Sequence, residues 1–343
     1  MKILMPIQNK DEIVPLLEAG ASEFYCGYIF ERWKRRYNKE KADGILQISL
    51  NNRDREKTNF ETQQELKEAL NLCERYNKTI YLTMNAKWYP ESCYGELDEY
   101  IQEVSQIGIK HLIVSDIGFI QFLSDCYPEM KLSISCLNEI YNSASVEFYR
   151  QFHPERIVFP RHIDIRDVEL IAKECTDMEF EVFVLSDKCI YNDGNCRCLH
   201  DWMPICQENW STNYQSESSY GTMTREFLNQ IEKCSDLFFR WSNDYKLGYE
   251  DVYKWAHVGC SLCAIHNLMK LSNVVSYKVV GRGYKLSEKI FQAQLVFKIM
   301  EMIRAGLSIL EIMNYMAHIS GEATFCSSGM HCIMRGKYDG DRA

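Results

Sequence analysis

Residues 79–116, TIYLTMNAKWYPESCYGELDEYIQEVSQIGIKHLIVSD, decide the fold class of this chain. They begin with the apolar run Thr79–Met84, continue with an amphipathic stretch over Tyr94–Ile107, and end on a second apolar run, His111–Asp116. Short apolar runs predict buried strands, and apolar residues spaced three and four apart predict a helix between them. Two strands joined by one helix form a parallel β-α-β unit.

The same alternation extends in both directions along the chain. Apolar runs predict further strands at residues 2–7, 23–28, 131–136, 156–161, 179–185 and 276–280. Helical patterns separate most of them, over residues 9–19, 60–76, 117–126, 143–152, 164–173 and 287–305. A parallel sheet whose strands alternate with helices closes into a barrel when it has eight strands. We therefore predict an α/β fold, a (β/α)8 barrel of the triosephosphate isomerase type. An open doubly wound sheet is the alternative.

One interruption breaks this rhythm, between the seventh and eighth predicted strands. It contains seven of the 15 cysteines and four of the 6 tryptophans. We therefore predict barrel strands one to seven over residues 1–185 and a cysteine-rich, cluster-binding insertion lobe over 186–275. The last strand and helix follow over 276–305, and a C-terminal helix with a cysteine-containing tail over 306–343.

Composition limits the class of protein. The chain has 39 Lys and Arg against 48 Asp and Glu, a net charge of −9. Nucleic-acid-binding proteins usually carry a basic excess, so this balance argues against nucleic acid as an obligatory partner. No apolar run approaches the roughly 20 residues that cross a bilayer, and the first residues lack a secretory signal pattern. The expectation is a soluble cytoplasmic protein without a membrane partner.

The cysteines beyond residue 188 indicate a metal centre rather than disulfides, because reducing compartments keep thiols free. Cys189 lies just past the seventh predicted strand, at the end of the barrel where chemistry gathers. Cys196 follows an Asp-Gly turn, and Cys260-Ser-Leu-Cys263 is a clean CxxC pair. Sites made only of thiolates select zinc or iron–sulfur clusters. The wide, irregular spacing favours a cluster over the two compact pairs of structural zinc, which stays the alternative.

Several short segments, and the order in which they occur along the chain, are informative about the family. They are Leu4-Met-Pro-Ile-Gln-Asn9, Leu17-Glu-Ala-Gly-Ala21, Ile157-Val-Phe-Pro-Arg161, Val182-Phe-Val184 with Cys189 and Gly194-Asn-Cys196, Leu262-Cys-Ala-Ile265 and Lys278-Val-Val-Gly-Arg282. Together they resemble the collagenase-like U32 peptidase family over most of the chain. The chain departs from the family at Ser186-Asp-Lys-Cys189, where the family's histidine is missing, and at Val280, which replaces a glutamate.

The resemblance implies a cofactor and an activity. Family members that hydroxylate ubiquinone precursors or RNA without oxygen hold one [4Fe–4S] cluster on four cysteines. Carried over by motif, the ligands here are Cys189, Cys196, Cys206 and Cys263, with Cys198 and Cys260 as substitutes for Cys206. The implied function is a [4Fe–4S]-dependent modification enzyme, performing oxygen-independent hydroxylation or related redox chemistry on a small molecule, peptide or RNA. A true peptidase and a non-catalytic, cluster-bearing partner subunit are the alternatives.

Polar side chains at the predicted strand ends are the candidate catalytic residues. They are Asn85, Asp116, Asn138, Arg161 and Arg282. Together they would line a polar pocket facing the cluster, and the two arginines would hold a carboxylate. The competing interpretation is that they satisfy loop backbone groups and form salt bridges. The peptidase motifs GxSxG and HExxH are missing from the chain.

The segment Phe325-Cys-Ser-Ser-Gly-Met-His-Cys332 has no counterpart in the family motifs. The implied cluster leaves Cys198, Cys260, Cys326 and Cys332 unused, enough thiols for a second metal centre. Folding of the tail back against the barrel mouth, with His331 or Cys332 in the pocket, is an equal alternative. The remaining alternatives are solvent-exposed, idle side chains and a redox-sensitive pair.

Overall fold

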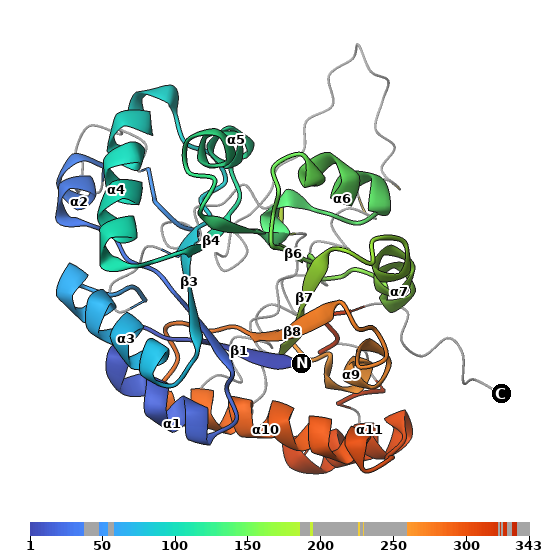
Figure 1. The fold of residues 1–343 in the computed structure, drawn as a ribbon. Helices are drawn as coiled ribbons and strands as arrows, with labels where there is room; N and C mark the ends of the chain where they lie inside the picture. Colours follow the sequence, from blue (N-terminus) through green and yellow to red (C-terminus); the bar gives the residue numbers. More distant parts are fainter. Residues whose placement is uncertain are drawn as a thin grey trace. The chain divides into compact units, whose positions relative to one another are not determined.

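A closed barrel of eight parallel strands, arranged in sequence order from β1 to β8, forms the fold (Figure 1). The computed structural model describes residues 1–37, 48–53, 58–185, 193–194, 226, 229, 259–321, 323, 325–327 and 331–334. β1 pairs with both β2 and β8, so the first and last strands complete the ring. The predicted (β/α)8 barrel is confirmed, and the alternative of an open sheet is wrong.

The strands lie close to their predicted positions. They are β1 (Lys2–Pro6), β2 (Glu23–Cys26), β3 (Thr79–Met84), β4 (His111–Val114), β5 (Lys131–Ile134), β6 (Arg156–Val158), β7 (Glu179–Leu185) and β8 (Val274–Val279). The helices are α1 (Ile13–Glu18), α2 (Glu31–Tyr37), α3 (Gln63–Arg75), α4 (Tyr94–Ile107), α5 (Ile117–Cys126), α6 (Ser143–Arg150), α7 (Ile165–Glu174), α9 (Ile265–Leu268), α10 (Leu286–Arg304) and α11 (Ile309–Ser320). Short 3-10 turns are η1 (Lys10–Glu12), η2 (Glu91–Cys93), η3 (Cys136–Asn138) and η6 (Leu262–Ala264).

Polar residues at the loop ends start several of these helices. The Asp116 side chain accepts a hydrogen bond from the backbone N–H of Phe119 at 2.7 Å, and Thr62 accepts one from Glu65 at 3.1 Å. Such N-caps satisfy donors that the first helical turn leaves unpaired. Helix α4 ends at Gly108, whose φ of 109° lies in the left-handed region that favours glycine.

Helix α2 is the main element that the sequence pattern does not predict. Its run of charges surrounds Trp33, which is fully buried and donates its indole N–H to the carbonyl of Ile48 at 2.9 Å. Arg32 and Arg36 form ion pairs with glutamates of α4. The helix is therefore held by one tryptophan and by charge pairing, rather than by an apolar face of its own.

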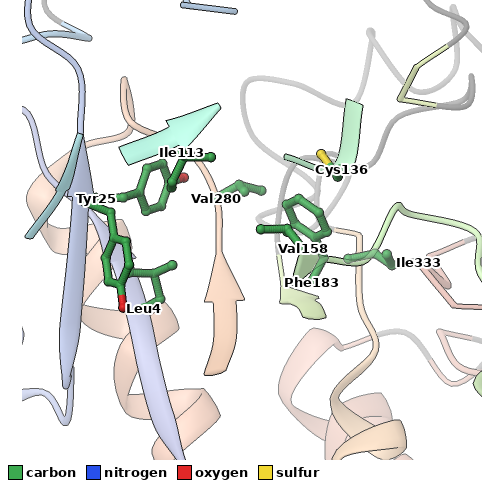
Figure 2. Packing of buried hydrophobic residues seen from close by; sticks show 9 residues of the cluster. Leu4, Tyr25, Ile113, Cys136, Val158, Phe183, Val280 and Ile333 are labelled. Carbon is green, nitrogen blue, oxygen red and sulfur yellow. The ribbon is translucent and has the colours of Figure 1, made fainter. Parts of the chain in front are cut away.

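The barrel interior combines an ionic cluster with an apolar one. Arg156 pairs with Glu23 at 3.0 Å and with Glu181 at 3.1 Å, and Lys278 pairs with Glu181 at 2.7 Å. The apolar cluster consists of Leu4, Tyr25, Tyr81, Ile113, Cys136, Val158, Phe183, Val280 and Ile333 (Figure 2). Because Ile333 belongs to it, part of the tail folds into the barrel core.

The chain divides into two compact units, Met1–Arg197 with Gly259–Ala343 and Cys198–Val258. The predicted insertion lobe over 186–275 stays a prediction, because most of it lies outside the described residues. Residues 259–275 belong to the barrel unit. Among the described helices, none combines the length and the apolar character that crossing a bilayer requires.

Candidate functional site at the barrel mouth

The tail segment 331–334 lies at the C-terminal ends of the strands. The backbone N–H of His162 donates to the carbonyl of Ile333 at 2.8 Å, and the N–H of Ile333 donates to the carbonyl of Cys260 at 3.1 Å. Ile333 is 1% exposed and lies beside Phe183, as Figure 2 shows. The tail segment therefore folds back against the barrel mouth, while a contribution of His331 or Cys332 to a substrate pocket stays a prediction.

Cys263 is the member of the predicted ligand set that the structure places. Leu185, the last residue of β7, forms an antiparallel bridge with Cys260, and the N–H of Ser261 donates to the carbonyl of Val184 at 2.8 Å. Cys263 follows in η6 and is 4% exposed. It therefore lies near the C-terminal end of β7, on the face of a barrel where active sites are built.

The other proposed ligands, Cys189, Cys196 and Cys206, and the substitute Cys198, lie outside the described residues. In the sequence, Cys189 follows Leu185, the last residue of β7, by four residues.

A well-anchored turn, Asp193–Gly194, precedes Cys196 in the sequence. The Asp193 carboxylate is 5% exposed, accepts the backbone N–H of Arg161 at 2.8 Å and forms an ion pair with the Arg161 guanidinium. Lys87 donates to the carbonyl of Gly194 at 3.1 Å. Cys196 comes two residues after Gly194 in the sequence. The turn itself is held beside Arg161, in the loop that follows β6.

Gly194 has no room for a side chain. A Cβ atom there would lie 2.2 Å from Cγ of Glu139 and 2.6 Å from the carbonyl oxygen of Leu137. Because one of these neighbours is backbone, relief requires the turn or the loop after β5 to move. This close approach gives the glycine of the Gly194-Asn-Cys196 motif a physical reason.

We expect Gly194→Ala to displace the turn and to cost about 1–3 kcal/mol, the usual price of overpacking. Hydrogen exchange of the residue 193–194 amides should rise, and metal retention by the purified protein should fall. Gly95→Ala is the matched control, because a Cβ at Gly95 meets nothing within 4 Å. Equal exchange in the two variants would show that the close packing does not hold the turn.

The predicted catalytic arginines hold loops in this structure. Arg282 is 6% exposed and donates to Asn59 at 3.0 Å, Asn51 at 3.0 Å and Thr83 at 3.2 Å, which fixes the loop after β2. Arg161 holds the Asp193 turn and lies over the Phe183 ring, 4.2 Å from its centroid. The two arginines are therefore anchored to different loops of the mouth.

The remaining candidates also contact protein groups. Asp116 caps α5 and accepts the N–H of Tyr89 at 3.0 Å. Asn85 accepts the N–H of Asn52 at 3.2 Å, and Asn138 donates to the hydroxyl of Tyr149 at 2.9 Å. These contacts support the loop-holding interpretation, and a catalytic role for these residues stays a prediction.

Cys136 lacks the properties of a cysteine-protease nucleophile. It begins η3, two residues after the end of β5, and packs in the core cluster with Ile333. Burial raises the pKa of Cys136 to about 12, an effect that the nearby Asp193 carboxylate increases. A cysteine nucleophile requires a lowered thiol pKa, so Cys136 is an inert core residue.

Residues 8–325 match the sequence model of peptidase family U32. The chain belongs to peptidase family U32. Among curated U32 relatives, tRNA hydroxylation protein P of Escherichia coli is 28% identical over 145 residues, covering 41% of this chain and 31% of the relative. The Helicobacter pylori J99 protein of the same name is 25% identical over 197 residues, covering 57% of this chain and 42% of the relative. The chain thus spans less than half the length of these relatives.

Solved U32-type structures are more distant. The U32 peptidase Mk0906 superposes with a TM-score of 0.41 at 9% identity, over 54% of this chain and 69% of that protein. The names of the U32 relatives also bear on the expectation about nucleic acid. The acidic composition argues against a nucleic-acid partner, whereas the names of these relatives refer to tRNA.

The structure adds residues to the U32 site that sequence reasoning missed. Asp193 is the buried partner of Arg161, Lys87 holds the turn from the loop after β3, and Ile333 fills the mouth. Only Asp193 carried a sequence signal, since it precedes the glycine of a family motif. Within the described residues, no three His, Cys, Asp or Glu side chains already converge on one metal position.

Proposed function

We propose that this U32 protein is a [4Fe–4S]-dependent modification enzyme that performs oxygen-independent hydroxylation or a related redox reaction. The observation that carries the proposal is the convergence of Cys263 and the Asp193–Gly194 turn on the ends of β6 and β7. Cys263 is one of the proposed ligands, and Cys196 follows the Asp193–Gly194 turn by two residues in the sequence. Cys189, Cys196, Cys206 and Cys263 are the proposed ligands.

The chemistry of the donor set fits such a cluster. Four cysteine thiolates without carboxylates are the usual ligands of a [4Fe–4S] centre, which supplies one-electron chemistry when bound. The protein's own contribution is to position the segments that carry the ligands and to surround them with an apolar environment. Arg161 positions the turn through Asp193, and the apolar cluster with Phe183 and Ile333 keeps water from the barrel interior.

RNA is the substrate class that we propose first. The relatives named for tRNA hydroxylation support it, although they match this chain over only part of their length. The net charge of −9 requires that any RNA contact use a local surface rather than the whole molecule. Small molecules and peptides remain the competing substrate classes, which direct assay separates.

Metal and sulfide analysis of anaerobically prepared protein tests the cofactor. We expect about four iron and four sulfide per chain, and near-complete loss of both in Cys189→Ser and Cys196→Ser. Cys126→Ser is the matched control, because Cys126 is an exposed residue of α5 and should leave the cluster unchanged. Stoichiometric zinc without sulfide in the wild-type protein would contradict the proposal.

A second candidate is a non-catalytic, cluster-bearing partner subunit. The observation that favours it is the filled mouth, where Ile333 occupies the core cluster and the polar candidates bind protein groups. Mass spectrometry of nucleosides separates the two functions. Hydroxylated nucleosides formed by the loaded protein alone support the enzyme, and formation only when a second subunit is added supports the partner role.

A further inference from the structure

One small cavity in the barrel unit gathers sulfur and imidazole side chains. It is lined by Cys260, Cys263, Met316, Phe325, Cys326, His331 and Cys332. Four of these residues are cysteines, from two segments of the chain that are far apart in sequence. The free space between them is about 10 Å³, roughly that of one water molecule. This size suits a single ion and is too small for a four-iron cluster.

Backbone pairing places two of the cysteines side by side. Cys260 and Cys332 form a parallel bridge, in which the N–H of Cys260 donates to the carbonyl of His331 at 2.6 Å. Residues paired across such a ladder project their side chains to the same face. The backbone hydrogen bonds therefore place Cys260 opposite Cys332, independently of any contact between their side chains.

A buried aromatic ring anchors the rest of the cavity wall. Phe325 is 1% exposed and stacks on the His331 ring, with the centroids 4.3 Å apart and the planes 13° from parallel. Phe325 directly precedes Cys326, so the burial of Phe325 fixes the backbone position of Cys326. Met316 of α11 completes the wall.

We propose that this cavity binds one zinc ion, held by Cys260, Cys326, Cys332 and His331. Three cysteines and one histidine are a closed ligand set of structural zinc. Cys263 lines the same cavity and is the residue that we assign to the iron–sulfur cluster, so the two centres are neighbours. This assignment of Cys263 is the one point that rests on the proposed function.

Binding requires the side chains to turn, because no three such groups in the described residues already meet at one point. Rotation of a cysteine between χ1 wells 120° apart moves its Sγ atom by roughly 3 Å. Zinc–sulfur bonds are about 2.3 Å long, so the proposed site requires rotations of this size at the ligand side chains.

The zinc fastens the tail to the barrel. Cys332 directly precedes Ile333, which packs in the core cluster at the mouth. Cys260 belongs to the segment that is bridged to Leu185, the last residue of β7. An ion shared by these two segments adds a second attachment to the backbone hydrogen bonds. Removal of the ion should loosen residues 331–334, whose Ile333 packs in the same core cluster as Cys136, so the alkylation rate of Cys136 should report the loosening.

Elemental analysis of the full-length protein, prepared anaerobically in zinc-containing medium, tests the site. We expect about one zinc per chain, and at least a tenfold loss in the double variant C326S/C332S, whose iron content stays at the wild-type level. Cys136 alkylation in the double variant should be at least tenfold faster than in wild type. Cys332→His, which retains a zinc ligand, should restore most of the zinc if the single variant C332S loses it.

Further variants separate this proposal from the iron–sulfur cluster. C189S should lose iron and keep zinc, and C126S should keep both. C263S should lose iron and keep zinc, and the opposite result would overturn the ligand set. Wild-type protein without zinc above trace level, or zinc unchanged in C326S/C332S, would overturn the site itself, whatever the iron content.

Discussion

Replacing Arg156 by Met is expected to destabilise the barrel by about 3–5 kcal/mol, the usual effect of removing one partner from a buried ion pair. Arg156 is 1% exposed and holds the carboxylates of Glu23 and Glu181, each of which is 1% exposed. Methionine fills a similar volume but removes the shared cation, so that, within the described part of the chain, Glu23 pairs only with Lys2 and Glu181 only with Lys278. Urea unfolding at neutral pH measures the loss.

The pH dependence of this loss identifies its cause. Burial acts to raise the pKa of Glu23, but Arg156 and Lys2 outweigh burial and bring the pKa below its ordinary value. In the wild type, Glu23 therefore contributes stability above the unfolded-state pKa of about 4.3, and the contribution disappears as the pH falls through the folded-state pKa. Without Arg156, burial dominates and raises the pKa of Glu23. Protonation of Glu23 then removes the buried charge and reduces the destabilisation of the variant. The difference between wild type and Arg156→Met should shrink between pH 7 and pH 4.

Arg150→Met is the matched control. Arg150 lies on the outside of α6, where its ion pairs with Glu147 and Asp177 involve exposed carboxylates. Surface pairs of this kind contribute about 0–1 kcal/mol. An Arg156→Met effect no larger than that of Arg150→Met would mean that the interior carboxylates are neutral in the folded protein.

Arg161→Met is expected to lower the iron content of purified protein by at least tenfold. The change leaves the Asp193 carboxylate buried without its cation, which favours release of the turn that carries Cys196. Residues that orient metal ligands usually change metal affinity by about 10–100-fold when they are replaced. Iron and sulfide per chain, determined after anaerobic preparation, measure the effect.

Two comparisons make the Arg161 result specific. The double variant Arg161→Met/Asp193→Asn removes the uncompensated charge and should recover part of the iron. Arg166→Met removes an exposed ion pair with Asp164, away from the Asp193 turn, and should leave the iron content unchanged. Full iron retention in Arg161→Met would show that the turn does not position a ligand.

The barrel could be predicted from the sequence because its signals are local. Strands β3 and β7 and helix α4 begin and end at the predicted residues, since apolar runs, an N-terminal turn and a left-handed glycine mark each boundary nearby. Helix α2 could not be predicted in this way. Its burial depends on Trp33 reaching Ile48 and on arginines pairing with α4, contacts that no local pattern encodes.

The candidate site was predictable in position and only partly in composition. The polar residues that follow the strands do lie at the mouth, because parallel strands in a barrel all end on one face. Their partners come from elsewhere in the chain. Arg161 binds Asp193, and Arg282 binds Asn51 and Asn59. Ile333 packs in the same core cluster as Leu4, although the two are more than 300 residues apart in the sequence. Such pairings depend on the three-dimensional fold, so a single sequence does not reveal them.

The distance along the chain between β7 and β8 has a consequence for synthesis on the ribosome. β7 ends at Leu185 and β8 begins at Val274, and only β8 joins β7 to β1. At about 5–20 residues per second, translation of the intervening roughly 90 residues takes on the order of 5–20 s. During that interval β1 and β7 both present unpaired edges, which invite pairing with other chains. The nascent seven-stranded sheet is therefore the species that a chaperone has most reason to bind.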